Sequence, residues 1–482
     1  MLTQKITFWK WAVLFFFMLV YSSISLVNHY YFRTYSYDLG LETNALYDYA
    51  HFRLHNSTLL QPELKNYLSD HFSLLTMFIS PLVYIFGSYT LLLVQIAAIL
   101  FGGVGVFKFF NRKTGDEKFA LICMIHFFLM WGIYSALKFD FHHNVLGAML
   151  VPWFIYYFEK KKWPLCVFFF VMIIISKENM ALWMVFVCLA LAFMYRKDAT
   201  QRKVGAILSL ISMVYFYSVI ALIIPAIANK GNAYLHFKYD ALGNNFSEAL
   251  IFMIKHPVRT FSLLLDNQTG NTYYNGYKAE LYFVILLSGG YALLRRPIWL
   301  IMLLPIFGQK LFNSAPEKWG LDAQYSIEFV PVITLCAFSY INELKKKYLV
   351  GIFLLITTLS ATIYLMDSSK SVEFGRENLQ FYKAKHFKRD FDVKPVYDAL
   401  SVIPPEAIVS AQTDLVAHLS VRQTIYNFPV VLDAEYIAVL MSENTYPLEK
   451  DEFKETIDSY IHSDAWTSIV NTDVIKIFKR KK

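Results

Sequence analysis

Eleven apolar runs separated by polar loops constrain this sequence more than any other feature. A helix that crosses the hydrocarbon core of a bilayer needs about 20 residues, with about 17 as a lower limit. Shorter helices can surround a cavity, because their polar ends then need not face lipid. We therefore expect an all-α membrane bundle of about eleven transmembrane helices. The runs are 11–30, 90–110, 118–137, 145–159, 164–176, 179–195, 204–224, 281–294, 297–312, 326–342 and 348–366.

The composition supports a multi-pass membrane protein. Of the 482 residues, 56% are hydrophobic and only 17% are charged, which is too few charges for a soluble domain of this length. The net charge of +8 comes from basic residues in short loops between apolar runs. Such residues orient a protein in the membrane, so the charge does not indicate binding to nucleic acid.

The cysteines and the N-terminal segment fit the same class. Cys123, Cys166, Cys188 and Cys336 lie inside apolar runs without metal-ligand spacing, so we interpret them as small core residues. Residues 11–27 follow two lysines, as a signal peptide would, but they are long and aromatic-rich and lack a small-residue cleavage site. We expect a retained first helix.

Segment 71–87 decides the predicted topology, since it is apolar enough to cross the membrane. If the N-terminus is cytoplasmic and this segment does not cross, all strongly basic short loops lie on the cytoplasmic side, as the positive-inside rule requires. These loops are "NRKTGDEK", "EKKK", "RKDATQRK", "RRP" and "NELKKKY". We therefore interpret 71–87 as a membrane-surface or re-entrant helix on the outer side.

The composition becomes polar after about residue 367, which predicts two domains, 1–366 in the membrane and 367–482 outside it. In the second, "EAIVSA", "QTIYNF" and "EYIAVLM" are typical of short strands. "TDLVAHLS" and "EKDEFKETIDSYIH" indicate helices, and "SIVNTDVIKIFKR" indicates a closing hairpin with its turn near Asn471. The sequence thus predicts a small C-terminal extracytoplasmic α/β domain.

The loops assigned to the outer side hold most of the residues that could perform chemistry. Because these loops share one side of the membrane, we expect their polar residues to form one site. The candidates are Asp38, Glu42, Asp70, His71, Asp140, His142, His143, Lys177, Glu178, Gln324 and Tyr325.

Asp38 is the first candidate for a general base. It lies among Tyr35, Tyr37 and Leu39 at the end of the first apolar run. Partial desolvation by these neighbours raises the pKa of a carboxyl group toward values useful in proton transfer. An acid at the start of an ordinary helix is the alternative. Glu42, one helical turn further, is the alternative base.

Two further motifs place ionisable residues between apolar runs. In "KFDFHHN", Asp140 could orient an acceptor or serve as a second base, and His142 and His143 could bind phosphate. Adjacent helical residues diverge by about 100°, which disfavours joint metal ligation by the two histidines. In "IIISKENMALW", Lys177 could neutralise a phosphate or pair with Glu178. His71 is a similar candidate.

The order of these features resembles the GT-C type of membrane glycosyltransferase, such as the protein O-mannosyltransferases and the aminoarabinose transferases. That resemblance implies a first outer loop with an acid, a surface helix with a proline and a second acid in the next outer loop. Asp38, Pro81 and Asp140 fall in these places. More closely, the chain resembles a bacterial membrane family of unknown function. The matching motifs are "YDLG", "HFS", "FDFHH", "KE", "QYS" and "SAQTDLVAHLSVRQTIYNFP".

The resemblance implies a plasma (inner) membrane glycosyltransferase that uses a polyprenyl-phosphate-linked sugar and an extracytoplasmic glycan, lipid or protein acceptor. Asp38 would be the base, and Lys177 and His71 would hold the phosphate. No cofactor is assigned, and a divalent metal is optional because cationic side chains can stabilise phosphate. A lipid or polysaccharide flippase and a non-catalytic membrane assembly protein are the alternatives. Neither of these needs Asp38 for activity.

Overall fold

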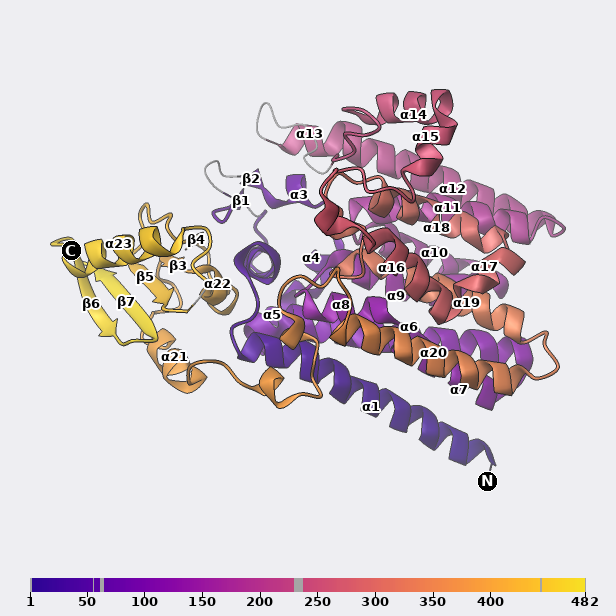
Figure 1. Cartoon of the computed structure of the whole chain (residues 1–482), viewed down its shortest axis with the longest axis horizontal. Helices are drawn as coiled ribbons and strands as arrows, with labels where there is room; N and C mark the ends of the chain where they lie inside the picture. The colour runs from indigo at the N-terminus through magenta and orange to yellow at the C-terminus, as the bar shows by residue number, and fades with distance from the viewer. Residues whose placement is uncertain (1, 55, 61–64, 229–236, 443, 482) are drawn as a thin grey trace. The chain divides into compact units, whose positions relative to one another are not determined.

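The computed structural model describes residues 2–54, 56–60, 65–228, 237–442 and 444–481 (Figure 1). The described chain is mostly helical and carries a small sheet near its C-terminus. Its helices are α1 (Leu2–Tyr30), α2 (Leu41–Ala50), α3 (Tyr67–Asp70), α4 (Leu75–Ile79), α5 (Val83–Phe86), α6 (Thr90–Thr114), α7 (Glu117–Leu129), α8 (Trp131–Lys138), α9 (His143–Glu159), α10 (Trp163–Ile174), α11 (Glu178–Met194), α12 (Ala199–Ser218), α13 (Ile224–Ile227), α14 (Phe246–Lys255), α15 (Pro257–Ser262), α16 (Tyr277–Ile285), α17 (Tyr291–Arg295), α18 (Ile298–Leu311), α19 (Phe329–Ile341), α20 (Lys347–Asp367), α21 (Val393–Leu400), α22 (Thr413–Leu419) and α23 (Lys450–Ile461).

The chain forms two compact units, each assembled from separate stretches of sequence. The first unit comprises 1–24, 70–75 and 95–380, and the second comprises 25–69, 76–94 and 381–482. The first polar loop of the sequence therefore folds with the C-terminal region. The division into functional domains 1–366 and 367–482 stays a prediction.

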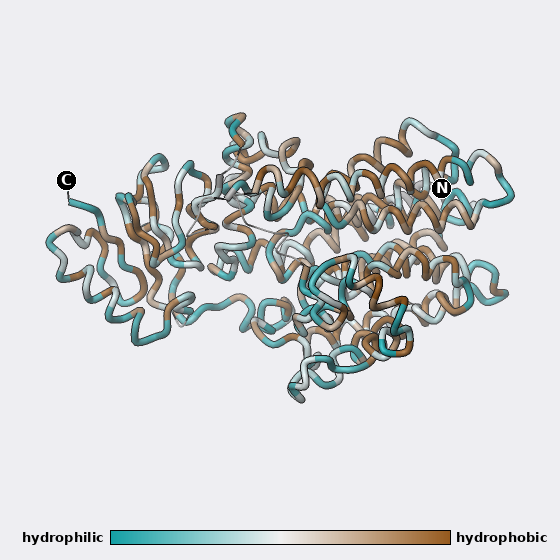
Figure 2. The backbone as a smooth tube through the Cα atoms, turned by 90° about the horizontal axis from the view of Figure 1, so that it is seen from above, coloured by the Kyte–Doolittle hydropathy of each residue, from teal (hydrophilic) through white to brown (hydrophobic). Residues whose placement is uncertain are grey.

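The first unit is a bundle of apolar helices. Every predicted apolar run of the sequence contains helix, which confirms the location of these segments. Figure 2 shows hydrophobic residues along the helices and hydrophilic residues in the connections between them. Within the bundle α11 packs against α12 and α18, α9 against α10, and α7 against α20.

The lengths of the helices give fewer candidate spans than the eleven expected. Among the described residues, five helical segments are long and apolar enough to cross a membrane, or six if the bent pair α7 and α8 is one span. Three further apolar helices, α10, α11 and α18, have 12, 17 and 14 residues. They are short because polar turns such as "SKENM" interrupt the apolar runs.

Close contact between helices explains the "GGVG" motif in α6. A Cβ atom on Gly103 would lie 2.2 Å from the ring of Phe128. One on Gly105 would lie 2.9 Å from the Trp153 indole. These glycines let α6 approach its neighbours, as small residues do in membrane bundles.

Residues 71–87 do not form the single helix that the sequence suggests. After α4 the chain makes a 3-10 turn at Ser80–Leu82, a short α5 and a second 3-10 turn at Gly87–Tyr89. Pro81 has no backbone N–H to donate to the preceding turn, and Gly87 has a φ of +54°. These two residues interrupt the helical path.

The second unit contains a mixed five-stranded sheet in the order β4-β3-β5-β7-β6. β3 (Val409–Ala411) pairs parallel with β4 (Ile425–Asn427) and β5 (Tyr436–Leu440), and β7 (Ile475–Arg480) pairs antiparallel with β5 and β6 (Trp466–Asn471). These strands, the helices α22 and α23, and the β6–β7 hairpin confirm the predicted elements. A separate pair, β1 (Asn56–Ser57) and β2 (Lys65–Asn66), lies in the first loop.

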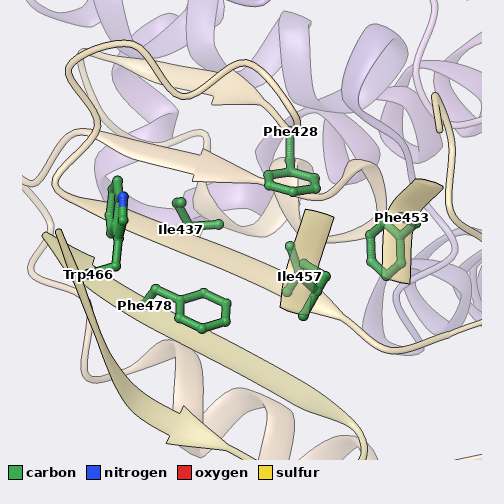
Figure 3. Packing of buried hydrophobic residues seen from close by; sticks show 7 residues of the cluster. Phe428, Ile437, Phe453, Ile457, Trp466 and Phe478 are labelled. Atoms are coloured by element: carbon green, nitrogen blue, oxygen red, sulfur yellow. The ribbon is translucent and has the colours of Figure 1, made fainter. Parts of the chain in front are cut away.

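An apolar core packs the sheet against α23 (Figure 3). Phe453 and Ile457 are four residues apart on this helix, so they lie on one face, and both are 2% exposed. They belong to one apolar cluster with Ile437 and Phe478 from β5 and β7, and the ring of Phe453 lies 6.1 Å from that of Phe428. The domain thus has its own core, as expected from the alternating strands and helices.

Candidate functional site

The predicted site residues are divided between the two units. Asp38 and Glu42 belong to the second unit. The candidates that belong to the first unit are His71, Asp140, His142, His143, Lys177, Glu178, Gln324 and Tyr325.

In the first unit, the segment after Asp70 is attached to the turn between α10 and α11. The backbone N–H of Phe72 donates to Glu178 (3.0 Å), and the N–H of Leu74 donates to the Ile175 carbonyl (2.9 Å). Glu178 is 2% exposed, and its Oε1 lies 3.5 Å from Nδ1 of His71. Glu178 therefore positions His71 beside this turn.

The loop that contains "FDFHH" is held by a buried glutamine from α6. Gln95 donates from Nε2 to the carbonyl of Asp140 (2.8 Å) and accepts from the N–H of His142 (3.0 Å). Asp140 has a φ of +55°, so this clamp maintains a backbone conformation that non-glycine residues rarely adopt. The loop presents His142 stacked on Phe139, with ring centroids 5.4 Å apart.

Lys177 lies at the centre of a group of basic side chains. It occupies the extended link before α11 and is half-buried. It lies within electrostatic range of His71, His142 and His143, and also of Lys318. The Lys177 carbonyl accepts from the N–H of Met180 (3.0 Å), whereas its ammonium group makes no hydrogen bond with a described residue and no ion pair with one within 4.0 Å. The site thus brings two ammonium groups and three imidazoles together, and Glu178 also lies within electrostatic range of Lys177.

The loop before α19 contributes further polar groups to the same surroundings. Lys318 lies over the ring of Tyr325, with Nζ 5.2 Å from the centroid. Asn144 donates to Glu328 (2.9 Å) and to the carbonyl of Gln324 (3.4 Å). Glu328 lies in turn within electrostatic range of Lys177, which connects these residues to the basic group.

The histidines near Lys177 favour their neutral form. Burial lowers the pKa of His71, Lys177 lowers it further, and Glu178 opposes the change. Burial, Lys177 and His71 hold the pKa of His142 well below its usual range. A neutral imidazole has one N–H donor and one acceptor nitrogen. The arrangement can therefore bind an oxyanion through the charge of Lys177 and hydrogen bonds from histidines.

The sequence reasoning missed Gln95, Asn144, Lys318 and Glu328. Gln95 was detectable as a lone amide inside an apolar run, and Asn144 directly follows the two histidines. Lys318 lies in an outer loop that the sequence already marked as polar. Nothing in their local sequence indicates which side chains they contact.

In the second unit, Asp38 lies in a π-helical turn, Ser36–Gly40, directly before α2. The hydroxyl of Ser36 lies 2.9 Å from that of Thr413, at the start of α22. A Cβ on Gly40 would lie 2.8 Å from Val416, so only glycine fits this contact. Asp38 is half-buried on this fixed turn, between exposed Tyr37 and a buried leucine.

Glu42 has a different environment from Asp38. It is 6% exposed and accepts a hydrogen bond from the hydroxyl of Tyr67, which is fully buried. A buried carboxylate with such a partner contributes to packing of the loop. Of the two acids, Asp38 is the better situated to meet a ligand from solvent.

Asp414 is a second acid of this unit that the sequence reasoning missed. It is 1% exposed, accepts from Asn444 Nδ2 (2.5 Å) and lies 3.6 Å from Arg389. Burial raises its pKa to about 7, although Arg389 and Asn444 oppose the rise. In the local sequence, the only sign that Asp414 could be important was its position as the second residue of a helix.

The described residues contain no group of three or more His, Cys, Asp or Glu side chains arranged to hold a metal ion. His142 and His143 have different ring partners, Phe139 and Phe141. The described candidate residues therefore do not fit a metal site.

The apolar helices, the polar connections and the small sheet domain define a multi-pass membrane protein. Residues 28–464 match the family described as "Predicted membrane protein (DUF2079)". The chain belongs to this family, whose function is unknown, and the resemblance to such a family is confirmed. No curated protein matches the chain.

The raised pKa of Asp414 predicts how stability depends on pH. An unfolded aspartate loses its proton near about pH 4, whereas the folded chain retains it to about pH 7. The stability that Asp414 contributes is therefore complete below about pH 4 and is lost as the pH rises to about 7. Replacing it by the neutral Asp414→Asn should raise the melting temperature more at about pH 8 than at about pH 5.

Thermal unfolding of the detergent-solubilised protein across this pH range measures the effect. Asp451→Asn, at an exposed position of α23, is the matched control and should show no such trend. A difference between Asp414→Asn and the parent that does not change with pH would contradict the expected protonation of Asp414.

Proposed function

We propose that the protein is a membrane glycosyltransferase of the GT-C type, which transfers a sugar from a polyprenyl-phosphate-linked donor to an extracytoplasmic acceptor. The basic group around Lys177 is the observation that carries the proposal. A lipid-linked donor carries its phosphate at the end of an apolar chain, so its binding requires an anion site in an apolar helical bundle. Lys177 with three histidines and Lys318 has the composition of such a site.

In the proposed reaction, Asp38 removes the proton from an acceptor hydroxyl. The hydroxyl oxygen attacks the anomeric carbon, and the bond between that carbon and the phosphate oxygen breaks. The electron pair leaves with the polyprenyl phosphate, an anion that hydrogen-bond donors and cationic groups stabilise. A single displacement of this kind inverts the configuration at the sugar. Asp140 is retained as a candidate for orienting the acceptor.

The proposed topology has about eleven spans, a cytoplasmic N-terminus and the C-terminal α/β domain outside a plasma membrane. Its support is the arrangement of five basic short loops, which all fall on one side if 71–87 does not cross. The helices α10, α11 and α18 would then cross as short members of the bundle, shielded from lipid along part of their length.

Single cysteine substitutions test this topology. Asp451→Cys, exposed on α23, should react with a membrane-impermeant maleimide in intact spheroplasts. Lys197→Cys, exposed in the basic loop between α11 and α12, should react only after the membrane is disrupted. The four native cysteines are buried, so background labelling should be low. The reverse pattern would place the C-terminal domain in the cytoplasm.

Asp38→Asn should abolish transfer while the protein remains folded. Removal of a general base typically lowers the rate by about 10²–10⁴-fold. Glu42→Gln is the matched control, because the amide oxygen can still accept from Tyr67. The assay follows consumption of radiolabelled lipid-linked sugars by membranes that contain each variant.

Each pattern of results has a distinct meaning. Loss of transfer only in Glu42→Gln would move the base to Glu42. Normal transfer in both variants would refute the proposed mechanism and favour a flippase or a non-catalytic assembly protein.

Lys177→Met should weaken binding of the donor phosphate. A hydrogen bond to a charged group contributes about 1.5–3 kcal/mol, which corresponds to roughly 10- to 150-fold in affinity. Binding of farnesyl phosphate to the purified protein measures this loss. Lys162→Met, in an exposed loop, is the control and should bind as the parent does. If Lys177→Met binds normally but melts at a lower temperature, Lys177 has a structural role.

A further inference from the structure

We propose that the carboxyl edge of the parallel strands in the second unit, with Tyr37 and Tyr446, binds a neutral saccharide. The strands β4, β3 and β5 run parallel, so their carboxyl ends lie at one edge of the sheet. In open α/β sheets this edge is where ligands commonly bind. Gln412 directly follows β3, and Asn427 is the last residue of β4.

Two buried amide groups at this edge have oxygens that remain to be satisfied. Gln412 is fully buried, and its Nε2 donates to the Asn444 carbonyl. Asn427 is 4% exposed. Within the described part of the chain, neither Gln412 Oε1 nor Asn427 Oδ1 has a hydrogen-bond partner. A buried acceptor without a donor costs about 1–3 kcal/mol, so a ligand that donates hydrogen bonds would be favoured here.

Exposed aromatic rings adjoin these amides. The amide N–H of Asn427 lies within range to donate to the Tyr37 hydroxyl, so Oδ1 is the atom of this amide that lacks a partner. Tyr37 and Tyr446 are 44% and 54% exposed, and their rings meet edge-on with centroids 6.4 Å apart. Such rings offer apolar faces next to polar groups, which suits a ligand that has both hydroxyl groups and C–H faces.

Charge at the edge favours a neutral ligand. Asp414 lies 3.6 Å from Arg389, so this pair carries no net charge above about pH 7, where both groups are ionised. The unsatisfied groups are acceptors, and phosphate at neutral pH offers them few donors. A saccharide hydroxyl can donate to an amide oxygen and accept from an amide N–H, so it matches both Gln412 and Asn427.

The bound saccharide would be the acceptor of the transfer reaction, and this role rests on the proposed function. Asp38 directly follows Tyr37 on the turn that Ser36 and Gly40 attach to α22. Binding itself requires no donor and can be measured when no transfer is detected.

Saturation-transfer difference NMR on the full-length protein tests the site. The probes are the methyl glycosides of glucose, galactose, mannose and N-acetylglucosamine. We expect at least one to bind, and Tyr37→Ala and Tyr446→Ala each to weaken that binding at least fivefold. Tyr273→Ala, at a 61% exposed position of the first unit, is the control and should bind normally.

Asn427→Leu separates binding from folding. Leucine has a similar volume and no acceptor, so it should abolish binding while the melting temperature stays the same or rises. A lower melting temperature with unchanged binding would show that Asn427 only supports the fold. Absence of binding by every glycoside, or binding in both tyrosine variants as tight as in the parent, would overturn the proposal. The proposal would also be overturned if the peptide acetyl-trialanine amide bound more tightly than the glycosides and the same substitutions weakened its binding.

The same assay distinguishes the two proposals. Saccharide binding that persists in Asp38→Asn, together with normal transfer by that variant, would refute the transferase mechanism and leave the binding site intact. Transfer that depends on Asp38 but is unaffected by Tyr446→Ala and Asn427→Leu would refute only the saccharide site.

Discussion

The free-energy cost of an ammonium group in a low-dielectric environment determines where the first unit can hold charge. A basic residue at membrane depth costs roughly 2.5–3.5 kcal/mol by insertion scales, so such residues are confined to helix ends and pair with anions. Lys138 follows this rule, since its Nζ lies 2.7 Å from Asp322. Lys177 also lies at a helix end and has Glu178 within electrostatic range, but its ammonium forms no ion pair within 4.0 Å with a described residue, and histidines and Lys318 lie near it. The contrast between these two lysines is the physical basis for assigning an anion-binding role to one and a structural role to the other.

The second unit meets a different requirement, because its polar residues are buried by an α/β core. Glu42, Asp414 and Gln412 all reside in this unit with low exposure, and each has at least one hydrogen-bond partner. The contact between Ser36 and Thr413 holds the turn that carries Asp38, and Asn444 holds the edge that carries Gln412. A rigid support of this kind is what positioned catalytic and binding groups need. The two proposed roles, base and saccharide site, therefore draw on the same set of supporting contacts.

Local patterns predicted the elements well and their long-range contacts poorly. Apolar runs located the helices, and alternation located β3, β4, β5 and the terminal hairpin, since both signals lie within a few residues. Interruption of 71–87 follows from Pro81 and Gly87, which were visible but outweighed by the apolar residues around them. No periodic pattern in the sequence predicts that Gln95 hydrogen-bonds to a loop 45 residues away. Nor does any local signal show that residues 25–69 fold with residues 381–482.

Residues 25–69 contact residues that are synthesised much later in the chain. Asn44, beside the Asp38 turn, donates to the carbonyl of Arg422 at 2.6 Å, across 378 residues of sequence. Synthesis proceeds from the N-terminus at about 5–20 residues per second, so the first loop emerges well before its partners exist. Until the last quarter of the chain has been made, the turn that carries Asp38 lacks the helix that supports it. A product that ends before residue 413 therefore carries every residue of the first loop but lacks the helix α22 and the Arg422 carbonyl that this loop contacts.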